Sequence, residues 1–133
     1  RIWGESEDIS NLRIWGYRNV WYRFDLYEAD IIVPVTLNSM SILRSTFNNC
    51  YLSQKKASFP SYEFDGPFSD LSQSIWVEQH KELQLLLGRD YWYENKNPHL
   101  RAVHGAVNLK EMNTNEFLSV ARKLEKQMEG SSI

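Results

Sequence analysis

Aromatic and arginine side chains alternate between Leu12 and Phe24, and they are the residues of this sequence best suited to bind a ligand. The stretch includes Arg13, Trp15, Arg18 and Trp21, with one tyrosine between them and a tyrosine and an arginine directly after Trp21. Such rings can stack on a nucleobase or attract a cationic ring through their quadrupole. They can equally form core contacts and cross-strand pairs. The stretch therefore offers a candidate stacking surface, with packing as the alternative.

Residues typical of catalysis or metal binding do not form recognisable groups. His80, His99 and His104 fall on different expected elements, and one cysteine leaves no zinc-ligand spacing. Cys50 falls near the core-facing side of an expected helix, where a thiol behaves as a small apolar group. The sequence has no phosphate-cradling glycine loop, GxSxG or HExxH motif. We therefore expect a binding module rather than an enzyme, with no catalytic residue, metal or cofactor.

The bulk composition is that of one globular domain. The 133 residues are 42% hydrophobic and 14% aromatic, enough to bury one core. The formal net charge of −2 argues against a duplex nucleic-acid binder, although three or four local positive charges can hold a short phosphate group. No apolar run is long enough to span a membrane. Because the chain starts at Arg1 without a methionine, we expect it to be one domain of a longer polypeptide.

Alternating apolar and polar residues predict several strands. The clearest alternation runs from Val20 to Tyr27 and is typical of a half-buried strand. A second strand is expected from Ile31 to Leu37, where Pro34 indicates a sheet edge or a bulge. Asp90–Tyr93 and Leu100–Leu109 are expected to form two further strands around a turn.

Three helices are expected from apolar spacing and capping signals. The first is capped by Asn38 or Ser39 and runs to residue 51, and the second starts at Ser69 or Asp70 and stops at Gly88. The last begins at Asn113, where Glu116 completes a capping box. Residues 54–69 form an aromatic loop that we expect to pack on the body. The buried sides are expected to contain Met40, Leu43, Phe47 and Tyr51, then Leu71, Ile75, Leu83 and Leu86, then Phe117, Val120, Ala121, Leu124 and Met128. This order predicts an α+β domain with helices on a mainly antiparallel sheet.

Four stretches, taken in order, resemble the cap-binding domain of the second basic polymerase subunit of orthomyxoviruses, the influenza-like viruses. Leu12–Trp15 is similar to the strand that carries the first cap-stacking ring, and Ser41–Arg44 to the start of the long helix. Leu85–Asp90 is similar to the end of the helix that carries the second ring. Ala102–Leu109, followed by a helix rich in leucine and basic residues, is similar to the end of the domain. The resemblance extends loosely from Leu12 to Met128, with an unmatched loop from about residue 53 to 69, and suggests a divergent, thogotovirus-type member.

This resemblance implies a function in viral transcription by cap snatching. Residues 1–133 would be a cap-binding-like domain of a polymerase subunit whose catalysis lies in other domains and subunits. Its partners would be those other polymerase parts and, with weak binding, capped RNA or a nucleotide. No membrane partner is expected, and the domain would act in the host nucleus and be present in the virion. In the family, two aromatic rings sandwich the cationic N7-methylguanine, a carboxylate accepts its N1–H and N2–H₂ donors, and a lysine reaches its O6.

Carried over by position, these four roles fall on Trp15, Asn19, Ser45 and Leu87. Trp15 matches the first ring. Asn19 is not a charged acceptor, Ser45 replaces the lysine, and Leu87 has no π-face in place of the second ring. The resemblance thus implies a retained fold with a vestigial or weak cap site.

Two other hypotheses remain open. The domain could bind a cap or nucleotide through substitute groups, with Trp3, Tyr91 and Trp92 as rings and Glu5 or Asp25 as the carboxylate. Alternatively, it is a protein-interaction module unrelated to this family. The exposure of Trp15 discriminates between them, because a ring that binds a ligand must be accessible beside a cleft.

Overall fold

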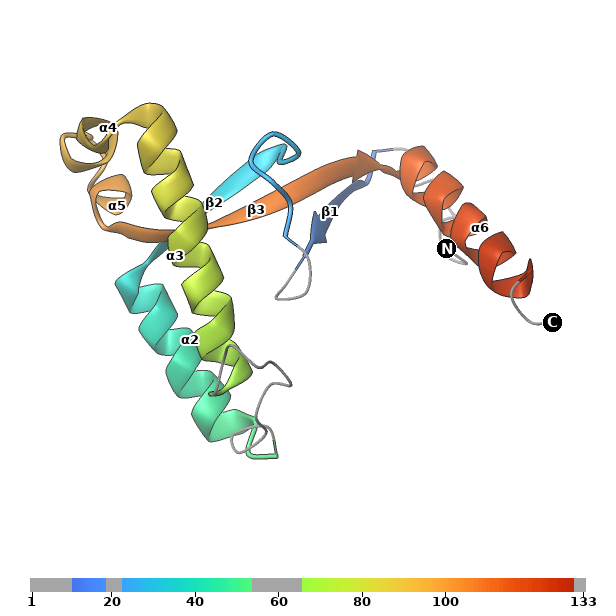
Figure 1. The fold of residues 1–133 in the computed structure, drawn as a ribbon, viewed down its shortest axis with the longest axis horizontal. Helices are drawn as coiled ribbons and strands as arrows, with labels where there is room; N and C mark the ends of the chain where they lie inside the picture. Colours follow the sequence, from blue (N-terminus) through green and yellow to red (C-terminus); the bar gives the residue numbers. More distant parts are fainter. Residues whose placement is uncertain (1–10, 19–22, 54–65, 131–133) are drawn as a thin grey trace.

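An eleven-residue strand, β3 (Val103–Asn113), forms the centre of the sheet. The structure is a computed structural model and describes residues 11–18, 23–53 and 66–130. β1 (Arg13–Tyr17) pairs antiparallel with the second half of β3 and β2 (Ile31–Thr36) with the first half, in the order β1-β3-β2 (Figure 1). Helices pack against this three-stranded antiparallel sheet, which confirms the expected α+β class.

Pro34 lies on β2, an edge strand, as its missing N–H requires. The pairing of β2 with β3 shifts register between Val35 and Thr36. The sequence indicated either an edge or a bulge here, and the strand has both features.

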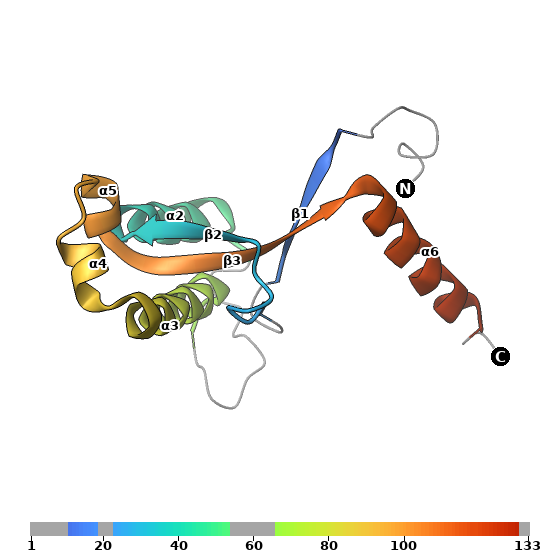
Figure 2. The ribbon, with the colours of Figure 1, turned by 90° about the horizontal axis from the view of Figure 1, so that it is seen from above.

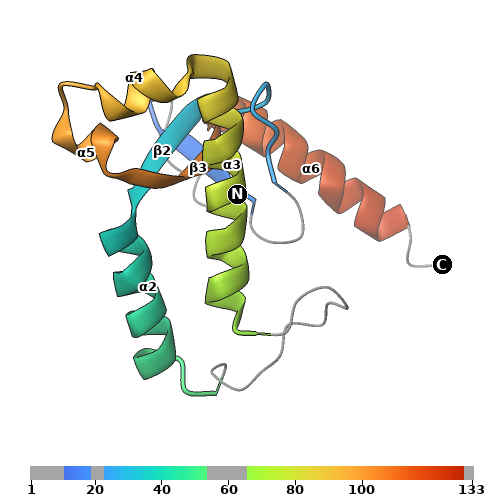
Figure 3. The ribbon, with the colours of Figure 1, turned by 60° about the vertical axis from the view of Figure 1, so that its left-hand side comes forward.

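Two long helices, α2 (Leu37–Cys50) and α3 (Phe68–Leu87), lie next to each other beside the sheet (Figures 1 and 3). Thr36, and not Asn38 or Ser39, caps α2, since its hydroxyl accepts the Ser39 N–H at 3.3 Å. α3 begins one residue before Ser69, after Pro67, which supplies no side-chain cap. Gly88 ends it with φ of 81°, a conformation that favours glycine.

The main core lies where α3, β3 and the short helix α4 (Arg89–Tyr93) meet. Leu83, Trp92 and Ala106 form its buried centre. Leu26, Leu100 and Val103 pack around them and are partly buried. Trp92 thereby fixes α4 against the sheet.

Several predicted elements differ from the observed ones. Residues 23–25 are irregular and 26–28 form a turn, so the described part of Val20–Tyr27 is not a strand, while residues 20–22 lie outside the described residues. The alternating apolar residues have another cause than strand pairing. Phe24 is buried, and its carbonyl accepts a hydrogen bond from Asn108 Nδ2 on β3. The segment therefore covers the sheet instead of pairing with it.

The predicted hairpin after Gly88 is also wrong. Asp90–Tyr93 belongs to α4, and Leu100 lies in α5 (Pro98–Arg101), a single turn started by Pro98 and capped by Asn97. Only the part from Val103 onward is a strand. The four residues Asp90–Tyr93, three of them aromatic, are too few to distinguish a strand from a helix by their pattern. The contact of Trp92 with the core favours the helix observed here.

Three residues expected on the core-facing sides of the first two long helices are exposed. Leu86 near the end of α3 is 69% exposed, whereas Leu83 one turn earlier is buried. Cys50, the last residue of α2, is exposed, and Tyr51, its C-cap, is 57% exposed. All three lie at helix ends.

The last helix, α6 (Thr114–Gly130), extends away from the other elements along the long axis of the molecule (Figures 1 and 2). Its expected capping box is present: Asn113 Oδ1 accepts the Glu116 N–H at 3.0 Å, and Glu116 Oε2 accepts the Asn113 N–H at 2.9 Å. Leu118 is buried, but most of the expected apolar stripe is not. Val120, Leu124 and Met128 are all more than half exposed.

Candidate functional site

The indole of Trp15 lies on the sheet surface beside a carboxylate. Trp15 and Glu111 are directly opposite each other in the pairing of β1 with β3. The Trp15 Nε1–H donates to Glu111 Oε2 at 2.9 Å, and Arg13 Nη1 donates to Glu111 Oε1, also at 2.9 Å. Trp15 is 60% exposed. This group, which we call the Trp15–Glu111 site, combines an accessible π-face with a negative charge at its edge.

Tyr17 connects this site to an aromatic cavity of about 430 Å³. It lies two residues after Trp15 on β1, hence on the same face of the strand. Burial raises the pKa of the Tyr17 phenol, and a hydrogen bond with Trp76 opposes that rise. The volume is within the range of small-molecule pockets. The other lining residues come from α2 and its C-cap, from α3 and from β3: Leu43, Phe47, Tyr51, Phe68, Ser69, Ser72, Trp76 and Val107.

The described cap-site positions do not converge. Trp15 lies near the end of β3 that leads to α6, whereas Leu87 ends α3 beside α4, at the other end of the molecule (Figure 1). Ser45 is exposed on α2, where its hydroxyl accepts a hydrogen bond from Asn49 Nδ2 at 3.3 Å. Asn19 lies outside the described residues. Trp15 and Leu87 therefore cannot sandwich one ligand in this structure.

The alternative contacts do not form a sandwich either. Trp92 is buried and packs edge-to-face on His80, with the ring centroids 4.7 Å apart. Tyr91 is half exposed, but its ring stands at 83° to that of Trp92, so the two rings cannot stack on opposite faces of one base. Asp25 is exposed directly before the turn that precedes β2, while Trp3 and Glu5 lie outside the described residues.

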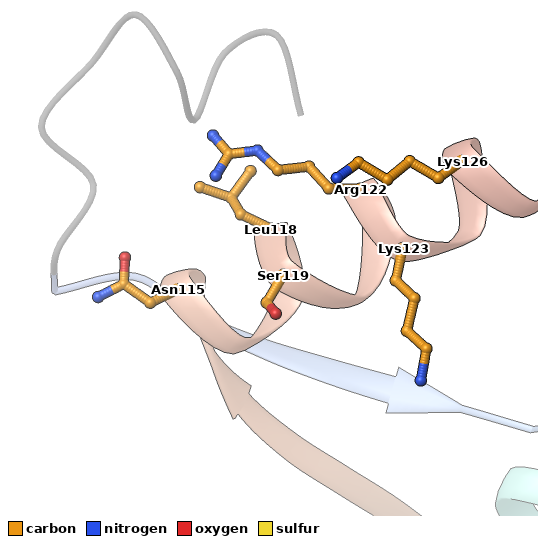
Figure 4. A pocket seen from close by; sticks show the side chains of 6 residues that line it. All are labelled: Asn115, Leu118, Ser119, Arg122, Lys123 and Lys126. Carbon is orange, nitrogen blue, oxygen red and sulfur yellow. The ribbon is translucent and has the colours of Figure 1, made fainter.

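A second hollow, of about 550 Å³, lies along α6 and carries positive charge. Arg122, Lys123 and Lys126 line it together with Asn115, Leu118 and Ser119 (Figure 4). Arg122 and Lys126 lie side by side, whereas Lys123 leaves the helix in a different direction (Figure 4). No carboxylate belongs to its described lining. From sequence, these cations were noted only as part of a closing helix rich in leucine and basic residues.

The residues predicted from the sequence include Trp15 and Tyr17, as rings of the Leu12–Phe24 stretch, but not Glu111. Glu111 is 96 residues from Trp15, and only the strand register brings the two together. Alternation along β1 places Trp15 and Tyr17 on one face. Cross-strand neighbours cannot be inferred from a single sequence when the pairing is unknown.

Comparisons with protein-family models, curated proteins and solved structures found no match for this chain. Among the described residues, no three His, Cys, Asp or Glu side chains gather as a metal site. No helix in that part of the chain is long and apolar enough to cross a membrane.

Proposed function

We propose that this chain is a cap-binding-like domain of an orthomyxovirus-type RNA polymerase subunit whose cap pocket is no longer assembled. In this proposal it supports transcription by cap snatching as a binding and structural domain. Catalysis lies in other domains and subunits of the complex, which are its partners. The complex works in the host nucleus and is carried in the virion.

The resemblance and the order of elements support the proposed family, and the separation of Trp15 from Leu87 is the observation that carries the loss of the cap pocket. A cap site selects N7-methylguanine mainly because two aromatic faces enclose its cationic ring. Here Trp15 supplies one accessible face, and the position of the second ring holds an aliphatic side chain at the other end of the molecule. A single ring stacks on any base with little preference.

The order of elements is compatible with the resemblance. Leu12–Trp15 leads into β1, Ser41–Arg44 lies in α2, Leu85–Leu87 ends α3, and Ala102–Leu109 enters β3 before the capped helix α6. Each stretch thus occupies an element of the kind that the resemblance implies. This agreement supports the proposal at the level of architecture.

A second candidate function is cap or nucleotide binding through substitute groups, and the Trp15–Glu111 site is the observation that favours it. Glu111 could take the role of the carboxylate that Asn19 lacks. Its two oxygens each already accept one hydrogen bond, from Arg13 and from Trp15, so a guanine would share the carboxylate with these donors or displace them. Competition with these donors lowers the net gain from each new hydrogen bond.

Variants at this site separate the two candidates. We expect N7-methyl-GTP and GTP to quench the tryptophan fluorescence of the unmodified chain equally and weakly. Trp15→Ala should abolish most of this quenching, and Glu111→Gln should leave the ratio between the two nucleotides unchanged. Tyr27→Ala, at a ring that is 86% exposed elsewhere, is the matched control. Preferential binding of N7-methyl-GTP that Glu111→Gln removes would favour the substitute cap site instead.

A further inference from the structure

Two lysines of α6, Lys123 and Lys126, are not paired in the way that several other cations of the domain are. Four of those cations each contact a carboxylate at 2.7 to 3.2 Å: Arg13 with Glu111, Arg23 with Glu78, Arg44 with Asp70 and Lys110 with Asp30. Within residues 11–18, 23–53 and 66–130, neither Lys123 nor Lys126 forms an ion pair. Their charges are therefore not neutralised by a carboxylate in the described chain.

These lysines face a hollow whose remaining described lining favours anions. Ser119 offers a hydroxyl and Asn115 an amide, both of which can donate to a phosphate oxygen. The acidic residues of α6 are absent from its described lining. Successive residues are about 100° apart around a helix, so Arg122, Lys123 and Lys126 spread over about 100° of its surface. That spread suits a chain of phosphates crossing the helix better than one compact anion.

We propose that this face of α6 binds the phosphate backbone of single-stranded RNA. The inference rests on the proposed function, which places the domain in a polymerase that handles capped transcripts. The contact is sequence-independent, because phosphates carry no base information. It is also independent of the methylated base, since no residue of the Trp15–Glu111 site lines the hollow.

The test is the salt dependence of binding to an uncapped, fluorescently labelled oligouridylate, followed by anisotropy. Two phosphate contacts, from Lys123 and Lys126, contribute about −1.4 to the slope of log K against log salt concentration for a single strand. The double variant Lys123→Gln/Lys126→Gln should remove this contribution and weaken binding at low salt about tenfold. Circular dichroism checks that α6 persists, which is expected because glutamine is nearly as good a helix former as lysine.

The matched control is Lys81→Gln/Lys96→Gln, which removes the same charge at exposed positions outside α6. This variant should retain the slope and most of the affinity. If both double variants lost the same affinity and slope, the effect would depend on net charge alone, and the proposal would be overturned. A slope near zero, or a short polyglutamate that binds as tightly as the RNA, would also overturn it. Failure here leaves the comparison of N7-methyl-GTP with GTP unaffected, so the two proposals can fail separately.

Discussion

Gly105 is the position at which a single side chain most directly controls how the helices approach the sheet. A Cβ atom there would collide with Met40 Cε and lie 3.0 Å from Trp76 Cβ and 3.3 Å from the Trp76 carbonyl carbon. The end of Met40 can swing aside, but Trp76 is fixed by the backbone of α3. The absence of a side chain at residue 105 therefore allows α2 and α3 to pack closely on β3.

Gly105→Ala should consequently destabilise the domain by about 1–3 kcal/mol, the usual cost of overpacking. The control is Gly130→Ala at the end of α6, where no atom lies within 4 Å and no loss is expected. Urea unfolding midpoints compare the two. Equal midpoints for Gly105→Ala and the unmodified chain would contradict this close approach.

His80 makes stability depend on pH. Burial lowers its pKa below the ordinary 6.5, and the nearby His104 lowers it further. Its Nδ1 has no hydrogen-bond partner in the described chain, and its Nε2 lies 3.1 Å from Gln84 Nε2. The folded state thus favours the neutral imidazole, while the unfolded chain binds a proton at higher pH.

The contribution of His80 is therefore present above about pH 6.5 and is lost as the pH falls toward its lowered folded pKa. We expect the free energy of unfolding to decrease between pH 7 and 5, and the decrease to be smaller in His80→Gln. His99→Gln, at an exposed position in α5, should retain the decrease of the unmodified chain. If the pH dependence of the His80 variant equals that of the His99 variant, the assignment to His80 is wrong.

At the scale of elements, α6 depends on its N-terminus more than the other helices do. In the described chain it contacts β1 and β3 near its start, and its apolar stripe is largely exposed. A helix of this length is marginal in water without packing. Its capping box is therefore expected to contribute to its stability.

Asn113→Ala should weaken α6 by about 1 kcal/mol, with Asn113→Gly milder, because an N-terminal N–H loses its acceptor. Hydrogen exchange of the α6 amides should accelerate more than exchange in α3. Asn115→Ala changes the same residue type two positions later, outside the box, and should leave these rates nearly unchanged. Uniform exchange rates across all three proteins would show that the cap contributes little.

Local signals predicted elements well, and signals that depend on distant contacts did not. The box at Asn113 and Glu116 and the stop at Gly88 involve neighbours in sequence, so they could be identified without coordinates. Val20–Tyr27 shows the opposite case. Its alternation reflects the burial of Phe24 against β3. Such burial is expected both of a strand and of an irregular segment that covers the sheet, so the pattern does not distinguish them.

At the scale of the whole molecule, the α+β class followed from the sequence, but the convergence of site residues did not. Trp15 was predicted as a stacking ring and is accessible. Its neighbour Glu111 and the aromatic cavity beside Tyr17 depend on strand register and on helix packing across long sequence separations. The separation of Trp15 from Leu87 likewise could not be predicted from the sequence, because it depends on the direction of α3.

The central claim is that the domain cannot select a methylated cap, and isothermal titration with N7-methyl-GTP and GTP tests it most directly. Loss of the second ring removes about 1–2 kcal/mol of cation–π attraction. Loss of a charged acceptor at residue 19 removes about another 1–2 kcal/mol. Together these losses shift a micromolar site by roughly two decades toward the millimolar range. We predict weak binding with equal affinity for both nucleotides. Saturable micromolar binding of N7-methyl-GTP, with much weaker binding of GTP, would contradict this claim.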